Sequence, residues 1–147
     1  MKGFWVAAVV AAWAGAALAE DPVTVSVTAE MDDVVFELET AIANAGLVVD
    51  SVNHVGDMLE RTKADVGGTE TLFTAATVYN FCSAAVSREV MEADPMNLQY
   101  CPYAIFVMER PDAPGEITVG RRAYPAGPME AVSTLLDGII AEAVAGY

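Results

Sequence analysis

Hydrophobic positions change their spacing several times along the chain, and each spacing predicts an element. Residues 23–28 alternate valine with threonine or serine, which is the period of a half-buried strand. Over 31–45 the apolar positions recur every three or four residues, as on one face of a helix, and Gly46 follows where this helix would end. The segment 23–46 therefore predicts a strand followed by an amphipathic helix.

The same patterns predict the remaining elements. Apolar or alternating runs predict strands at 47–54, 72–81, 103–109 and 116–123, and helical spacing predicts helices at 55–63, at 83–93 and from Pro128 onward. The run 103–109 is apolar on both faces, as in a central strand or one that crosses a dimer interface. The order β-α-β-α-β-α-β-β-α predicts an α+β two-layer sandwich, with a mixed or antiparallel sheet and helices mainly on one face.

Residues 1–19 have the pattern of a secretory signal peptide. Lys2 supplies a positive start, residues 3–16 form an uncharged apolar run, and Ala17-Leu18-Ala19 is a small-residue cleavage site. The apolar run is shorter than the roughly 20 residues that span a bilayer. We expect cleavage after Ala19, a periplasmic or secreted bacterial protein without a membrane anchor, and a single domain over 20–147.

Charge excludes one large class of function. The chain has 7 Lys and Arg against 21 Asp and Glu, a formal net charge of −14 at pH 7. Proteins that bind nucleic acids carry clustered Lys and Arg that displace counterions, so no nucleic-acid partner is expected. The hydrophobic fraction of 54% with 19% charged residues also excludes a disordered acidic tail.

The two cysteines, Cys82 and Cys101, are the main chemical feature of the sequence. In an oxidising compartment an even number of cysteines favours a disulfide, and a loop of this size would add roughly 3 kcal/mol of stability. A thiol pair or a metal site is the alternative. A catalytic redox pair would need close spacing and a lowered thiolate pKa, and the sequence indicates neither.

A metal site could also include His54, the only histidine, at the end of the predicted strand 47–54. Met58 lies one helical turn later. Sulfur and imidazole ligands suit copper or haem iron, so Cys82, Cys101 and His54 are candidate metal ligands. The alternatives are a hydrogen-bonded histidine at a strand end and a methionine that fills the core.

Further binding candidates are Tyr103 and Arg122. Arg121 and Arg122 form a basic doublet on a predicted strand, so their side chains point to opposite faces and at most one lines a pocket. They either pair with nearby acids or clamp an anion. Nucleophile-elbow, phosphate-loop and dinucleotide motifs are missing from the sequence, which does not favour an enzyme.

Several segments resemble the domain-of-unknown-function family 302 (DUF302). They are Phe81-Cys82-Ser83-Ala84, Met91-Glu92-Ala93-Asp94-Pro95, Tyr100-Cys101-Pro102-Tyr103, Ile105-Phe106-Val107-Met108-Glu109 and Gly120-Arg121-Arg122. The resemblance runs from about Met31 to Tyr124, although Ser83-Ala84 stands where relatives have Asn-Pro, and many relatives reverse the order of Cys101 and Pro102. It implies a compact α+β fold, often a homodimer, with the two cysteines close in space, and it implies no established activity.

Three hypotheses follow. The first is an exported, non-enzymatic domain that binds a small ligand or acts as an accessory module, with a paired-cysteine centre and no cofactor. The second is a copper or haem carrier that uses Cys82, Cys101 and His54. The third is a thiol redox enzyme.

Overall fold

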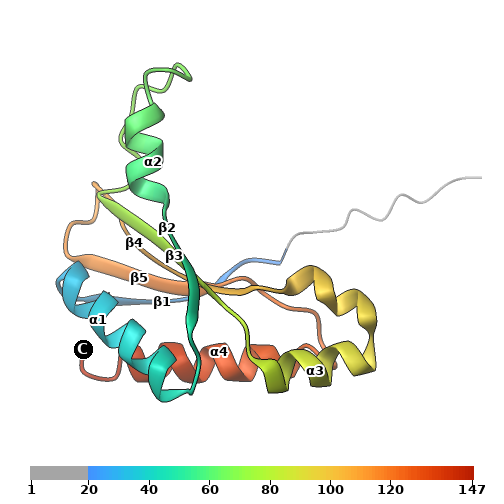
Figure 1. Cartoon of the computed structure of the whole chain (residues 1–147). Helices are drawn as coiled ribbons and strands as arrows, with labels where there is room; N and C mark the ends of the chain where they lie inside the picture. Colours follow the sequence, from blue (N-terminus) through green and yellow to red (C-terminus); the bar gives the residue numbers. More distant parts are fainter. Residues whose placement is uncertain (1–19) are drawn as a thin grey trace, which may run out of the picture.

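The computed structural model describes residues 20–147, so the leader expected at 1–19 lies outside the described residues. This part contains one five-stranded sheet in the order β1-β5-β4-β3-β2, in which every neighbouring pair is antiparallel (Figure 1). The strands are β1 (Val23–Thr28), β2 (Val49–His54), β3 (Ala75–Phe81), β4 (Tyr103–Glu109) and β5 (Glu116–Arg121). The helices are α1 (Met31–Asn44), α2 (Val55–Thr62), α3 (Ala84–Ala93), the short 3-10 helix η1 (Pro95–Tyr100) and α4 (Glu130–Ala143).

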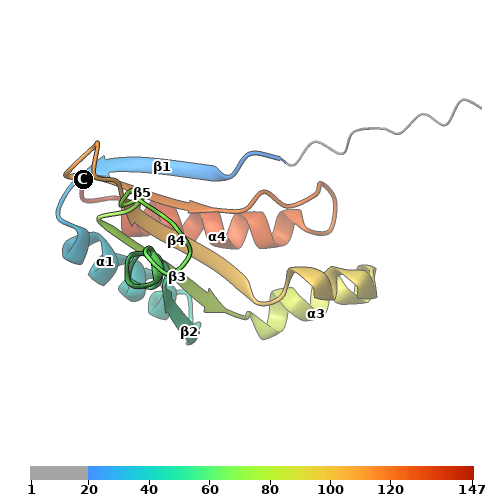
Figure 2. The same cartoon turned by 90° about the horizontal axis from the view of Figure 1, so that it is seen from above.

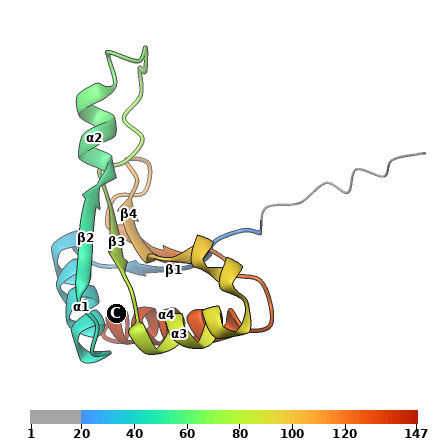
Figure 3. The same cartoon turned by 45° about the vertical axis from the view of Figure 1, so that its right-hand side comes forward.

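The α+β two-layer architecture is confirmed. Helices α1 and α4 lie against one face of the sheet, and the opposite face carries no helix layer in the described chain (Figure 2). The core between the layers consists of the inward-facing side chains of both, among them Val34, Leu38, Ile42, Ile105, Val107, Ile117, Val119, Val132, Leu136 and Ile139. Helices α2 and α3 lie beyond the sheet, at opposite ends of β3 (Figure 3).

Two glycines are required by the local geometry. Gly46 has φ +75°, which L side chains rarely adopt, and it ends α1 as the sequence predicts. Gly120 in β5 lies under the ring of Phe106, on the outer face of the sheet. A Cβ at this position would lie 2.5 Å from Phe106 Cζ and 2.9 Å from the backbone carbonyl oxygen of Val23. Because the Val23 backbone is held in the β1–β5 pairing, only glycine fits here.

Several predicted boundaries shift by a few residues. The strand predicted from residue 47 begins at Val49, because Leu47 packs against the core below the end of α1 and Val48 is 77% exposed. The run from 72 becomes a strand only at Ala75, and the strand predicted over 116–123 ends at Arg121. The last helix begins at Glu130, after a turn in which the Glu130 amide donates to the Gly127 carbonyl.

Helix η1 is the one described element that the hydrophobic pattern misses. Its start has a recognisable signal, because Asp94 Oδ1 accepts a hydrogen bond from the Met96 amide at 2.9 Å and Pro95 occupies the first turn. Its six residues are too few to show a helical period.

Membrane spanning is not supported by any helix between residues 20 and 147, because none combines the necessary length with the necessary apolar character.

Candidate thiol site

The cysteine pair lies where β3 ends and β4 begins. Cys82 directly follows β3, and Cys101 precedes β4 by two residues. Because the antiparallel register places Phe81 opposite Tyr103, the two cysteines meet at the same end of the sheet. Their Sγ atoms lie 2.8 Å apart, with Cys82 exposed and Cys101 half-buried. The structure thus brings together two of the predicted site residues.

Between the cysteines the chain forms a helical excursion, which we call the α3–η1 arm (residues 83–100). Ser83 Oγ caps α3 by accepting a hydrogen bond from the Val86 amide at 3.3 Å. Asn97 Nδ2 in η1 donates to the Val90 carbonyl in α3 at 2.8 Å, which joins the two halves of the arm. The chain leaves the sheet after β3 to form this arm and returns to it at β4 (Figure 1). The two cysteines flank the arm, so the thiol pair lies at its base.

The electrostatic environment of Cys82 favours the protonated thiol. Burial of the thiol, although the residue as a whole is exposed, is the largest cause that raises its pKa to about 11. The neighbouring Cys101 and the charge of Asp50 contribute to this rise, and a backbone hydrogen bond at Tyr103 partly offsets it. Cys82 is therefore a poor nucleophile near neutral pH, since the thiolate is the reactive form.

Three tyrosines pack beside the thiol pair. The rings of Tyr103 and Tyr124 meet edge to face, with centroids 6.3 Å apart, and those of Tyr100 and Tyr124 do so at 5.7 Å. The sequence pointed to Tyr103 but missed Tyr100 and Tyr124. Nothing in their local pattern marks them, because the contacts join η1, the start of β4 and the segment after β5.

The hydroxyl groups of Tyr103 and Tyr124 differ in their hydrogen bonding. Tyr103 Oη accepts a hydrogen bond from Ser87 Oγ at 3.1 Å. Tyr124 Oη is buried and has no hydrogen-bond partner among the described residues. Burial is the largest cause that raises the pKa of both phenols, that of Tyr124 to about 12. Neither phenol supplies a phenolate near neutral pH.

The arginine doublet separates as the strand geometry requires. Arg121 is buried and forms a bidentate ion pair with Asp137 in α4, with both N–O distances 2.7 Å. Arg121 Nη1 also donates to the Arg122 carbonyl at 3.0 Å. The pairing role predicted for the doublet is confirmed for Arg121. Arg122 is exposed, and its guanidinium pairs with no carboxylate of the described chain.

His54 does not belong to this site. It lies opposite Thr77, and its Nδ1 is 3.4 Å from Thr77 Oγ1. Cys82 follows the far end of β3, about 17 Å along the strand from Thr77 at ~3.4 Å per residue. The three-residue metal set of Cys82, Cys101 and His54 is therefore wrong. No group of three or more His, Cys, Asp or Glu side chains within 20–147 is arranged to hold a metal ion.

His54 and Met58 do share a hollow. It has a volume of about 270 Å³ and is completed by Val52, Asn53 and Val55. Both residues come from the β2–α2 junction, as the predicted spacing required, and Met58 is 41% exposed. Among the described residues, the ring nitrogens of His54 contact only Thr77. This agrees with the interpretation of His54 as a hydrogen-bonded histidine at a strand end.

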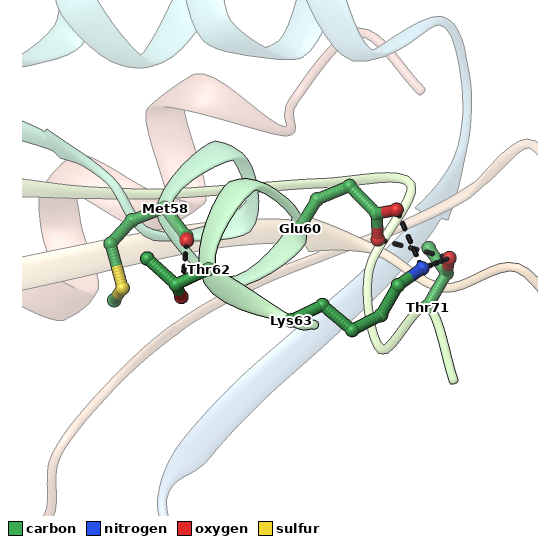
Figure 4. A network of polar contacts seen from close by, with 5 residues as sticks. All are labelled: Met58, Glu60, Thr62, Lys63 and Thr71. Atoms are coloured by element: carbon green, nitrogen blue, oxygen red, sulfur yellow. Dashed lines mark hydrogen bonds and ion pairs between the residues drawn. The ribbon is translucent and has the colours of Figure 1, made fainter. Parts of the chain in front are cut away.

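A separate polar network fixes the loop that follows α2 (Figure 4). Lys63 Nζ donates to Glu60 Oε1 at 2.6 Å and to Thr71 Oγ1 at 3.2 Å, and Thr71 donates to Glu60 Oε2 at 3.0 Å. The hydrogen bond from Lys63 is the largest cause that lowers the pKa of Glu60. Glu60 and Thr71 are exposed and Lys63 is half-buried, and the network ties the loop to the helix.

Comparison with known proteins agrees with this architecture. The crystal structure of an uncharacterized conserved protein DUF302 from Bacillus stearothermophilus is similar, with a TM-score of 0.57 and 18% sequence identity over 85% of this chain and 88% of that chain. At this identity the likeness shows the fold alone. None of the curated proteins matches the chain. A family model described as "Domain of unknown function DUF302" matches residues 23–124, a stretch that begins with β1, contains both cysteines and ends at Tyr124. Because this match covers more than half of the sequence, the chain belongs to the DUF302 family.

Proposed function

We propose that the chain is an exported, non-enzymatic binding or accessory domain in which Cys82 and Cys101 form a disulfide at the base of the α3–η1 arm. The observation that carries this proposal is the 2.8 Å separation of the two sulfur atoms. A disulfide bond measures about 2.05 Å, so the pair closes with a movement of less than about 1 Å. The expected signal peptide would supply the oxidising compartment in which such a bridge persists.

The bridge would serve binding by holding the arm in one position. The arm presents Met96 and Leu98, which are 68% and 64% exposed. Large apolar side chains at such exposure are available to a small ligand or a partner. Fixing the arm to the sheet before binding reduces the conformational entropy that is lost on binding. The arm, with the thiol pair at its base, is therefore the proposed contact surface.

A thiol redox enzyme is the least favoured alternative. Catalytic dithiols use a thiolate of lowered pKa, whereas burial and the neighbouring thiol raise the pKa of Cys82 to about 11. The proposal therefore expects slow alkylation of Cys82 at pH 7 after mild reduction. Alkylation at pH 7 faster than that of a free cysteine would favour the redox enzyme.

A copper or haem carrier remains an alternative only with a smaller set of ligands. The ligands would be Cys82 and Cys101 without His54, which is held at the other end of β3. Metal binding must also displace the thiol protons, and the raised pKa of Cys82 opposes this.

We also propose a homodimer, joined through the face of the sheet that no helix covers. This face carries the half-buried side chains of Ala76, Val78, Phe106 and Met108, which surround an apolar hollow of about 220 Å³. Burying this strip against a second copy removes apolar surface from water. Sedimentation velocity tests the interface: Val78→Lys is expected to give monomers, and the matched surface change Thr134→Lys on α4 is expected to leave dimers.

The experiment for the proposed function is purification of the exported protein from a periplasm without reductant. Thiols are counted under denaturing conditions, and the absorbance spectrum and metal content are measured on the same sample. The proposal expects no free thiols, no colour and no bound metal. A haem absorbance band, or stoichiometric copper that is lost in Cys82→Ser and kept in His54→Ala, would instead support the carrier.

A further inference from the structure

Strand β1 is an open edge of the sheet. It pairs with β5 on one side only, and no described element lies beyond its other side (Figure 2). Alternate N–H and C=O groups along that outer side therefore lack a strand partner within residues 20–147. An exposed edge of this kind is a template for a further strand from another molecule.

The other edge of the sheet, β2, is protected against such pairing. Its register with β3 is irregular between Val49 and Ser51, and Asp50 places a charge at this point. Irregular register and edge charges are the usual devices that prevent strand addition. By contrast, β1 keeps an unbroken register with β5 from Val23 to Thr28 and contains neither a charged residue nor a proline. The fold thus leaves one edge pairing-competent.

Beside β1 the hydrophobic layer is also open. A hollow of about 360 Å³ lies between β1 and α4, lined by Val23 and Val25 on one side and by Ile140, Ala141 and Val144 on the other. Val23 is 43% exposed. Side chains alternate along a strand, so every second residue of an added strand would point into this hollow. The hollow therefore selects apolar residues at alternate positions.

Charge selects the remaining positions. Asp137 also lines the hollow, but its carboxylate is already paired with Arg121. Acidic residues stand at both ends of β1, with Asp21 before it and Glu30 after it, and Glu116 lies opposite Thr28. Of the two arginines at the end of β5, Arg121 is paired with Asp137 and Arg122 is the one unpaired cation in the described chain there, so the surroundings stay acidic.

A second copy of this chain fits the edge poorly. Antiparallel pairing of two β1 strands would bring Asp21 of one copy near Glu30 of the other, and like charges repel across an interface. A basic segment meets complementary charge at both ends of the strand.

We propose that the β1 edge and the β1–α4 hollow bind an extended cationic peptide segment, with apolar residues at alternate positions, as an additional strand of the sheet. The backbone of β1 supplies the hydrogen bonds, and the hollow receives the apolar side chains. This surface is separate from the α3–η1 arm and from the outer sheet face, so it does not depend on the function proposed for them.

Fluorescence anisotropy with the purified chain tests the proposal directly. The probe is a labelled peptide of alternating lysine and valine, and the controls are an alternating glutamate and valine peptide and a lysine–valine peptide N-methylated at alternate residues. The protein variants are Ala141→Trp, which fills the hollow from an exposed helix position, and Thr134→Trp, an exposed position on α4 outside the hollow.

The proposal expects saturable binding of the lysine–valine peptide that weakens with added salt and falls by about tenfold in Ala141→Trp but not in Thr134→Trp. The glutamate peptide should bind far more weakly. The lysine–valine peptide can be N-methylated either at all its lysines or at all its valines, and one of these two versions should not bind, because it lacks the N–H groups that face β1. Two results would overturn the proposal. One is equal binding to the parent chain and Ala141→Trp. The other is no peptide binding together with self-association that Ala141→Trp abolishes, which would identify a second copy as the occupant.

Discussion

Ser87 Oγ donates a hydrogen bond to Tyr103 Oη at 3.1 Å, whereas the neighbouring Tyr124 hydroxyl is buried without a partner in the described chain. Removing a paired hydroxyl costs its hydrogen bond, but removing an unpaired buried hydroxyl relieves a desolvation penalty. We therefore expect Tyr103→Phe to lower the free energy of unfolding by about 1 kcal/mol. Tyr124→Phe should leave it unchanged or raise it by up to about 1 kcal/mol.

Urea unfolding of the two variants, monitored by circular dichroism, measures this difference. Each variant is the control of the other, because each loses one phenolic hydroxyl group from the same aromatic cluster. A larger loss in Tyr124→Phe than in Tyr103→Phe would show that the Tyr124 hydroxyl has a partner, such as a buried water or a bound ligand.

The ion pair between Arg121 and Asp137 links β5 to α4. Asp137→Asn leaves the buried guanidinium without its counter-charge, so we expect a loss of about 2 kcal/mol, less than the 3–5 kcal/mol typical of fully buried pairs because Asp137 is half exposed. The exposed pair of Arg110 and Asp112 is the control, and Asp112→Asn should cost less than about 0.5 kcal/mol. Equal losses in chemical denaturation would contradict the structural role of Arg121.

The proposed disulfide should appear as a redox-dependent stability. Without reductant, Cys82→Ser and Cys101→Ser should each lower the free energy of unfolding by roughly 3 kcal/mol, because the unfolded chain loses the same cross-link in both cases. With reductant the parent chain should fall close to the level of both variants. Identical denaturation midpoints of the parent chain with and without reductant would count against the bridge.

Acid should loosen the loop after α2. The pKa of Glu60 is lowered, chiefly by the hydrogen bond from Lys63, from an ordinary value of 4.5. A lowered pKa means that the folded state favours the carboxylate, so this contribution is complete above pH 4.5 and is lost as the pH falls through the lower folded value. An NMR titration of the Glu60 carboxyl should show a midpoint below 4.5 that rises in Lys63→Met. A midpoint insensitive to this change would contradict the network.

How far the fold follows from the sequence depends on the range of the signals. The strand 23–28 and the helix stripe containing Val132, Leu136 and Ile139 carry their periods within a single segment, and both form as predicted. The pairing of β1 with β5 joins segments about ninety residues apart, and no local pattern encodes it.

The candidate site shows the same limit. The family resemblance predicts that Cys82 and Cys101 are close in space, whereas their spacing in the sequence alone does not decide whether they pair. The position of His54 at the end of a predicted strand suggests that it lies near the cysteines. In an antiparallel sheet, however, the ends of neighbouring strands alternate between the two opposite ends of the sheet. The structure places His54 beside Thr77, at the end of the sheet remote from the thiols. Tyr124 was missed because its role depends only on tertiary contacts.

The most direct test of the central claim is a peptide map of the unreduced protein. Arg88 is the tryptic site between the two cysteines, because Arg110 is followed by Pro111, so trypsin separates residues 64–88 from 89–121. The exported protein is denatured, its free thiols are alkylated, and the digest is analysed by mass spectrometry. The account predicts one species with the summed mass of the two peptides less two hydrogen atoms, which reduction separates. Two separate peptides, each alkylated at its cysteine, would contradict it.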